Sequence, residues 1–187
     1  MTIPNMLTLF RICLVPLFVL FFYLPFPSFS WLTAFIFAFA ALTDWLDGYL
    51  ARNLSQTTRF GAFLDPVADK LVVVMALVLL VGEHHFTWMA IPAAIIIGRE
   101  IVVSALREWM AELGQRASVA VSCLAKIKTV VQMLAIFFLL IGRVPTLSWA
   151  KTFGWLGYIG LYAAAALTVW TLLLYLRAVW GEFKVSA

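Results

Sequence analysis

The chain has 187 residues, of which 65% are hydrophobic and 12% are charged, and its formal net charge is +4. With a mean hydropathy of +1.03, this composition excludes an ordinary water-soluble enzyme, because soluble domains carry about 25% charged residues. The sequence also lacks the dense basic runs that bind nucleic acid. We therefore expect a membrane protein with no nucleic-acid partner.

Six apolar segments, separated by polar connections, are each suited to form a membrane-spanning helix of about 20 residues. They leave no room for a soluble domain, so we expect residues 1–187 to form a single all-α integral membrane domain. At the opening of the chain, residues 4–11 are polar on one side at helical spacing, which predicts a short N-terminal interfacial helix that bends into the first span. The predicted transmembrane helices are residues 6–25, 31–51, 64–82, 86–108, 118–141 and 150–176.

The basic residues indicate how these six spans are oriented. Eleven of the 13 Lys and Arg residues fall at the termini, at the second-to-third and fourth-to-fifth connections, or at the adjacent helix ends. Arg143 and Lys151 are the two on the opposite side. Because cytoplasmic connections carry an excess of Lys and Arg, both termini are predicted to be cytoplasmic, with the turns at 82–85 and 142–145 facing outward.

All four aspartates of the chain fall within one window of 26 residues. Asp44 and Asp47 are three residues apart near the cytoplasmic end of the second span, and Asp65 and Asp69 are four apart at the start of the third. Each pair therefore shares one face of its helix. Carboxylates so close together in a membrane segment repel one another and are costly to bury, so positive charge is expected between them.

The positive charge between the aspartates has two candidate sources, basic side chains and metal ions. A salt-bridged helix junction would use Arg52, Arg59 and Lys70. Alternatively, two divalent cations would bind the four carboxylates, because Mg²⁺ and Mn²⁺ prefer carboxylate oxygens, and two such ions can hold a phosphoryl group during transfer. The sequence has no histidine near these acids, which argues against zinc.

Residues beside the aspartates favour the metal-site interpretation. Gly48, Ala51 and Gly61 leave the helix surfaces bare enough for a ligand to approach the backbone, although close helix packing would also explain each of them singly. Arg52 lies about 80° around the helix from Asp44 and is suited to contact a phosphate. A metal-bound diphosphate is the partner that this set of residues predicts.

The two aspartate pairs and their neighbours resemble the signature of the CDP-alcohol phosphotransferase family, D-x-x-D-G-x-x-A-R-x8-G-x-x-x-D-x-x-x-D. The match runs from Asp44 through Arg52 and from Gly61 to Asp69, and every fixed position of the signature is present. Eight residues at set spacings make it far more specific than a lone glycine motif. The resemblance extends over most of the chain.

The resemblance implies a function for each matched residue. Asp44, Asp47, Asp65 and Asp69 would bind two Mg²⁺ or Mn²⁺ ions, and Asp69 would also act as the general base. The CDP pocket would be lined by Gly48, Ala51, Arg52 and Gly61. An alcohol would attack the β-phosphorus of CDP-diacylglycerol and CMP would leave. The family also implies a homodimer, and its bacterial members imply the cytoplasmic (inner) membrane, with the active site on the cytoplasmic side.

The acceptor alcohol is predicted from residues 98–132, outside the aspartate motif. An arginine inside an apolar run and further basic residues nearby are suited to bind a phosphorylated acceptor, because a phosphate near lipid needs several charged donors. The same segment resembles a bacterial subgroup of the family whose acceptor is sn-glycerol 3-phosphate, although Ala125 replaces the glycine expected before Lys126. For Lys126 and Lys128, snorkelling at the membrane interface is the alternative. The predicted acceptor residues are Arg99, Arg107, Lys126, Lys128 and Thr129.

Two alternatives to this function are carried forward. Within the same chemistry, the acceptor would be inositol phosphate, serine or phosphatidylglycerol, and of these the phosphate-free serine would leave the basic residues unexplained. In a different class, acidic residues inside membrane helices also build ion or proton pathways. A transporter is expected to carry polar residues along its spans to both faces, whereas the outward halves here hold few acids, with Glu83 at a turn.

Overall fold

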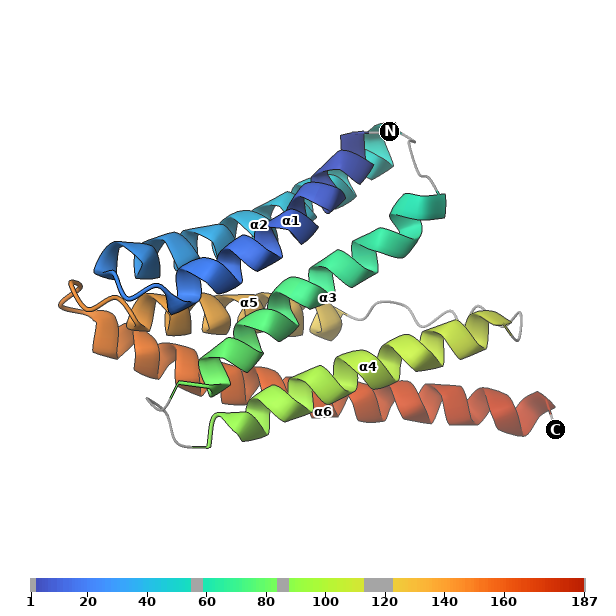
Figure 1. The fold of residues 1–187 in the computed structure, drawn as a ribbon. Coiled ribbons are helices and arrows are strands. Elements are labelled where there is room, and N and C mark those ends of the chain that lie inside the picture. The colour runs from blue at the N-terminus through green and yellow to red at the C-terminus, as the bar shows by residue number, and fades with distance from the viewer. Residues whose placement is uncertain (1–2, 55–58, 84–87, 113–122, 187) are drawn as a thin grey trace. The chain divides into compact units, whose positions relative to one another are not determined.

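The computed structural model describes the backbone of residues 3–54, 59–83, 88–112 and 123–186, with the side chains of most of them. This part of the chain consists of helices joined by turns and contains no strand (Figure 1). It therefore agrees with the predicted all-α class. The helices are α1 (Ile3–Tyr23), α2 (Pro27–Leu54), α3 (Arg59–Val81), α4 (Ala90–Glu112), α5 (Cys123–Gly142) and α6 (Ala150–Ser186).

Two of the helices contain segments long and apolar enough to cross a membrane, judged by length and composition. These segments are Met6–Tyr23 of α1 and Ala150–Arg177 of α6. Shorter apolar stretches occupy Phe29–Thr43, Lys70–Val81 and Ile127–Gly142 in the other helices. The helices thus fit a membrane protein, and each predicted span overlaps one of them.

The start of the chain differs from the sequence-based expectation. In place of a short interfacial helix followed by a bend, α1 continues without interruption from Ile3 to Tyr23. Pro16 lies inside this helix. Proline removes one internal hydrogen bond, but packing of the buried face of α1 keeps the helix continuous. Along that face, Thr8, Arg11, Leu14, Phe18 and Phe22 recur every three or four residues.

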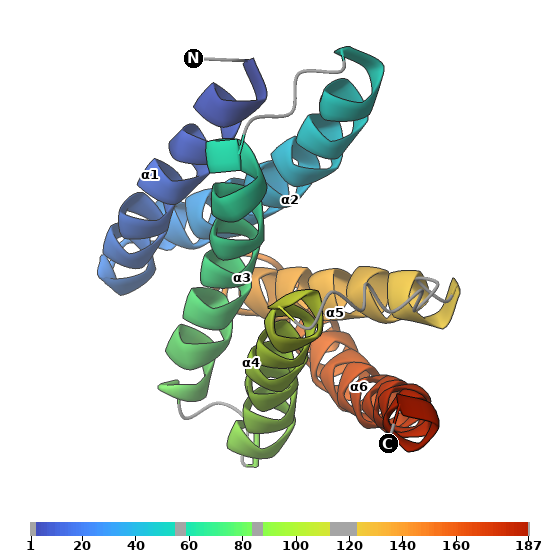
Figure 2. The same cartoon turned by 90° about the vertical axis from the view of Figure 1, so that its right-hand side faces the viewer.

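The chain divides into two compact units. Unit 1 comprises Met1–His85 and Ile136–Gly157, and unit 2 comprises Phe86–Ala135 and Tyr158–Ala187. In unit 1, α1 packs against both α2 and α3, and α2 and α3 also contact each other, though less extensively among the residues that the structure describes. The N-terminal ends of α1 and α3 and the C-terminal end of α2 lie at one end of this unit (Figures 1 and 2).

At the opposite end of unit 1, Arg143 contacts Glu83 and Phe22, and we call these three residues the arginine clasp. Arg143, in the turn after α5, donates from Nε to Oε1 of Glu83 at 2.6 Å, and its Nη2 donates to the backbone oxygen of Phe22 at 3.1 Å. The guanidinium carbon also lies 3.5 Å from the centre of the Phe22 ring. The two turns that were predicted to share one side of the membrane are therefore joined to each other, and the turn that holds Arg143 also contacts the C-terminal end of α1.

Small residues bring α5 and α6 close together within each unit. In unit 1, a Cβ atom on Gly142 would lie 2.6 Å from the Cα of Gly154. In unit 2, a Cβ on Gly160 would lie 3.1 Å from the Cβ of Ala135. Gly154 and Gly160 of α6 are thus helix-packing positions within one chain. Unit 2 also contains a small cluster in which Leu106 and Met110 of α4 pack with Tyr175 of α6.

Candidate active site

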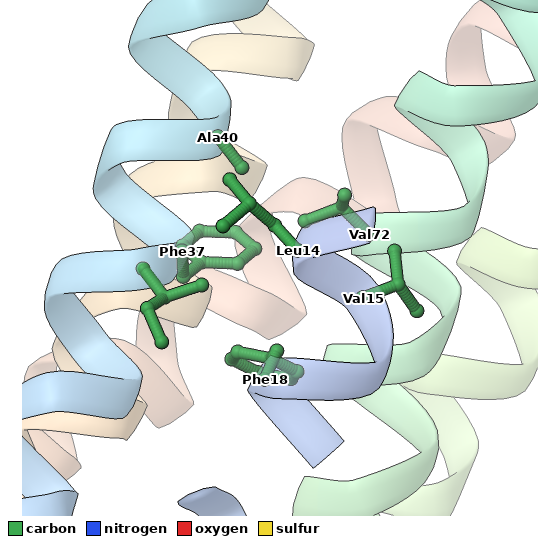
Figure 3. Close-up of a pocket in the computed structure, with 7 residues that line it drawn as sticks. Leu14, Val15, Phe18, Phe37, Ala40 and Val72 are labelled. Carbon is green, nitrogen blue, oxygen red and sulfur yellow. The ribbon is translucent and has the colours of Figure 1, made fainter. Parts of the chain in front are cut away.

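The two aspartate pairs lie on α2 and α3, toward the same end of unit 1. Positions along these helices can be compared at an apolar pocket, which is lined by Leu14 of α1, Ala40 of α2 and Val72 of α3 (Figure 3). Asp44 is one helical turn after Ala40, and Asp69 is one turn before Val72. Since α2 runs opposite to α3, both positions lie on the same side of the pocket (Figure 1).

The second member of each pair lies one turn farther from the pocket. Asp47 follows Asp44 along α2, and Asp65 precedes Asp69 along α3. The backbone therefore brings all four predicted ligand positions to the end of unit 1 where α2 ends and α3 begins. The carboxylate groups themselves lie outside the described part of the chain. The same holds for the surroundings of the predicted CDP-pocket residues Gly48, Ala51, Arg52 and Gly61.

The chemistry of these positions suits hard divalent cations. Four carboxylates supply only oxygen ligands, which Mg²⁺ and Mn²⁺ prefer. Among the side chains that the structure describes, no group of three or more His, Cys, Asp or Glu residues is placed to hold a metal. The aspartate positions of α2 and α3 thus remain the candidate metal site.

A buried arginine on α1 is a feature of this end of unit 1 that the sequence analysis missed. Arg11 is 1% exposed and Thr8 is 0% exposed. They lie one and two turns before Leu14, toward the end of the unit that carries the aspartates. Burying a guanidinium is costly unless negative charge lies nearby. The sequence does indicate this residue, because Arg11 lies inside an apolar segment. Arg11 entered the sequence analysis only through the distribution of basic residues that predicts membrane orientation.

Two predicted acceptor residues meet at a glutamate in unit 2. Lys128 of α5 donates from Nζ to Oε1 of Glu100 on α4 at 2.6 Å. Arg99 donates from Nη1 to the same oxygen at 3.1 Å. Lys128 is 2% exposed, so it does not reach out to an interface as a snorkelling lysine does. The sequence analysis assigned no function to Glu100.

The other predicted acceptor residues are less closely placed. Thr129 lies on the exposed side of α5, whereas its neighbour Lys128 is buried. Arg107 lies on α4 and Lys126 on α5, but their side chains fall outside the described part of the chain. Of the five predicted residues, the structure thus brings together Arg99 and Lys128.

Comparison with known proteins identifies the family. The model of the CDP-alcohol phosphatidyltransferase family matches residues 1–170, and the chain belongs to this family. A relative from Pseudomonas fluorescens is 56% identical over 187 residues, which cover 100% of this chain and 94% of the relative. A relative from Pectobacterium atrosepticum is 55% identical over 178 residues, covering 94% and 93% of the two chains.

A third relative, from Salmonella typhimurium, is 52% identical over 183 residues, covering 96% of each chain. All three relatives carry the name CDP-diacylglycerol--glycerol-3-phosphate 3-phosphatidyltransferase. The chain is thus similar over nearly its whole length to proteins whose name specifies both a donor and an acceptor. The family predicted from the aspartate signature is confirmed.

Proposed function

We propose that this protein transfers the phosphatidyl group of CDP-diacylglycerol to sn-glycerol 3-phosphate, forming phosphatidylglycerol phosphate and CMP. The observation that carries this proposal is the similarity, at 52–56% identity and nearly full length, to relatives named for this donor and acceptor. The complete aspartate signature supports the donor chemistry independently. The alternative acceptors and the transporter have no comparable support.

Transfer requires one bond to form and one to break. The oxygen of the acceptor hydroxyl bonds to the β-phosphorus of the liponucleotide, and the bond from that phosphorus to the CMP oxygen breaks, so that CMP leaves with the electron pair. We assign Asp69 as the general base that takes the hydroxyl proton, because a carboxylate within hydrogen-bond reach can accept it as the new bond forms. The position of Asp69 on α3, at the same end of unit 1 as the other three aspartate positions, suits this role.

The remaining aspartate-window residues are proposed to bind the donor. Asp44, Asp47, Asp65 and Asp69 would hold two Mg²⁺ or Mn²⁺ ions, which when bound offset the negative charge of the diphosphate. Arg52 would contact a phosphate of the donor, since guanidinium and phosphate form strong charged hydrogen bonds. The small residues Gly48, Ala51 and Gly61 would allow the nucleotide to approach the helix backbones.

Acceptor binding is assigned to the basic residues of α4 and α5. A dianionic phosphate in an apolar setting needs several charged donors, and Arg99 and Lys128 already lie within hydrogen-bond distance of one common oxygen in the structure. Arg107, Lys126 and Thr129 complete the proposed set. Inositol phosphate and phosphatidylglycerol also carry a phosphate, so they are tested directly against glycerol 3-phosphate below.

The proposed setting is the bacterial cytoplasmic membrane. We infer six transmembrane helices, with both termini and the aspartate site on the cytoplasmic side, from the hydropathy of the chain and its unequal distribution of Lys and Arg. We also propose a homodimer, on the strength of the family resemblance. Labelling of single cysteines placed at the turns around Glu83 and Arg143 tests the orientation, because both should react from outside the cell.

The function is tested with purified protein, CDP-diacylglycerol and Mg²⁺ or Mn²⁺. Release of CMP is measured with each acceptor in turn: glycerol 3-phosphate, inositol phosphate, serine and phosphatidylglycerol. We expect turnover with glycerol 3-phosphate to exceed that with every other acceptor by at least tenfold. Release of CMP with a different preferred acceptor would disprove the acceptor assignment, and no release with any of them would disprove the enzyme assignment.

A further inference from the structure

A carboxylate holds together the two cations that were assigned to the acceptor phosphate. Oε1 of Glu100 accepts from Lys128 Nζ at 2.6 Å and from Arg99 Nη1 at 3.1 Å. The side chains of Lys128, Arg99 and Glu100 are 3%, 12% and 22% exposed, respectively. Charges with so little exposure are costly unless they are paired. Glu100 therefore supplies negative charge that these two cations require.

A buried threonine of α6, Thr168, lies at about the same level of unit 2 as Lys128. Ala135 of α5 contacts Gly160 of α6, and α5 and α6 run in opposite directions (Figure 1). Lys128 is two turns before Ala135, and Thr168 is about two turns after Gly160, so these residues lie at about the same level. Thr168 is 0% exposed.

The contact between α4 and α6 places Glu100 of α4 at about the level of Thr168 of α6. Met110 packs with Tyr175, and the two helices run in the same direction (Figure 1). Glu100 lies ten residues before Met110, and the corresponding position on α6 is within one turn of Thr168. Glu100, Lys128 and Thr168 thus lie at about the same level of α4, α5 and α6, and we call these three residues the polar layer of unit 2.

Three buried polar atoms of this layer or its neighbouring turn have no hydrogen-bond partner among the described residues. They are Nε of Arg99, Oγ1 of Thr168 and Oε1 of Gln132. Gln132, which is 3% exposed, lies one turn after Lys128 on the same face of α5. Buried polar groups are normally satisfied, so several unsatisfied atoms in one region indicate a place for a polar ligand. A ligand with a phosphate and hydroxyl groups supplies both acceptors and donors.

We propose that Glu100 is a resident counter-anion that occupies the place of the acceptor phosphate, and that the phosphate of glycerol 3-phosphate displaces it from Lys128 and Arg99 on binding. This inference rests on the proposed function, because it takes those two cations as the acceptor-phosphate site. Glu100 acts as a positioning residue: it keeps both cations in one place while the site lacks substrate.

Charge balance explains why displacement is possible. The two cations and Glu100 carry a net charge of +1, so a dianionic phosphate is attracted to the group. The phosphate oxygens can accept from both cations at once, which replaces the hydrogen bonds that the carboxylate gives up. The displaced carboxylate and the phosphate repel each other, and this repulsion weakens acceptor binding. Removing the charge of Glu100 should therefore strengthen phosphate binding.

Glu100→Gln tests this expectation in purified protein in a zwitterionic detergent, where no anionic lipid headgroup competes. The thermal unfolding midpoint is measured against the concentration of inorganic phosphate, because a ligand that binds the folded state raises that midpoint. Without phosphate, Glu100→Gln should unfold at a lower temperature than the wild type. The phosphate concentration that gives half of the full stabilisation should fall at least fivefold, as should the KM for glycerol 3-phosphate, with the KM for CDP-diacylglycerol unchanged.

Glu83→Gln is the matched control, since Glu83 also pairs with a cation and is 25% exposed. It should lower the midpoint without changing the response to phosphate. If Glu100→Gln does not fold, Glu100→Asp serves in its place, because it draws the carboxylate back by one methylene. It should lower the half-stabilising phosphate concentration and the KM for glycerol 3-phosphate by a smaller factor. Weaker phosphate binding, or an unchanged response, would overturn the proposal for Glu100. If the wild-type protein shows no turnover when glycerol 3-phosphate is the acceptor, the proposed function itself is overturned.

Discussion

Gly142 approaches the backbone of Gly154 so closely that Gly142 has no room for a side chain. A Cβ atom on Gly142 would lie 2.6 Å from the Cα and 2.9 Å from the backbone nitrogen of Gly154. Backbone atoms cannot turn aside as a flexible side chain can, so the two helices would have to separate. The tight hairpin between α5 and α6 in unit 1 therefore depends on glycine here.

Gly142→Ala should destabilise the protein by about 1–3 kcal/mol, the usual cost of overpacking a tight contact. Thermal unfolding in detergent measures this effect. Gly98→Ala is the control, because a Cβ at Gly98 meets nothing within 4 Å, and replacing a helical glycine by alanine stabilises a helix by up to about 1 kcal/mol. Equal unfolding midpoints for the two variants would contradict the close contact.

Glu83→Gln should lower the free energy of unfolding by about 1–2 kcal/mol, because hydrogen bonds to charged groups contribute more than neutral ones. Arg143→Lys should cost a similar amount, since lysine keeps the charge but loses the planar group that contacts both Glu83 and the Phe22 ring. Chemical unfolding of the two single variants and the double variant measures their coupling. Fully additive effects would show that Glu83 and Arg143 are not energetically coupled.

Arg11→Gln should reduce kcat per folded molecule by at least tenfold. The buried guanidinium lies toward the end of unit 1 that carries the four aspartate positions, and we expect its positive charge to offset their negative charge. Arg143→Gln provides the comparison, because it removes a mostly buried arginine from the opposite end of the same unit. That variant should lose stability and keep the activity of its folded fraction. Equal losses of kcat in both variants would argue against a role for Arg11 at the site.

Arg107→Ala should raise the KM for glycerol 3-phosphate at least tenfold and leave the KM for CDP-diacylglycerol within twofold of the wild type. The reason is that a lost guanidinium removes charged hydrogen bonds to the acceptor phosphate alone. Initial rates with one substrate varied and the other saturating separate the two constants. A parallel rise in both constants would place Arg107 outside the acceptor site.

The helices and the family were predictable from the sequence because hydropathy and residue spacing act locally. A run of apolar residues marks a helix, and the fixed spacing of Asp44 to Asp69 identifies the family. The helix ends were less accurate: α3 begins at Arg59 and not at 64, and α6 continues to Ser186, past 176. Hydropathy detects the apolar part of a helix, whereas backbone hydrogen bonds continue through its polar ends.

The buried polar residues were harder to predict because burial depends on which helix packs against which face. Arg11, Lys128 and Thr168 stand in apolar helices, and their sequence context does not distinguish a buried face from a lipid-facing one. The pairing of Glu100 with Lys128 joins residues 28 positions apart on different helices. Such a contact depends on the packing of α4 against α5, which no local pattern specifies.

The most direct test of the proposed reaction is the mass of the lipid product, measured together with the amount of CMP released. Wild-type protein is supplied with CDP-diacylglycerol, glycerol 3-phosphate and Mg²⁺, and compared with Asp69→Asn at an equal amount of folded protein. We expect phosphatidylglycerol phosphate and CMP in equal amounts from the wild type, and a rate about 10²–10⁴-fold lower from Asp69→Asn, the usual contribution of a general base. A different lipid product, or an Asp69→Asn rate close to that of the wild type, would contradict this mechanism.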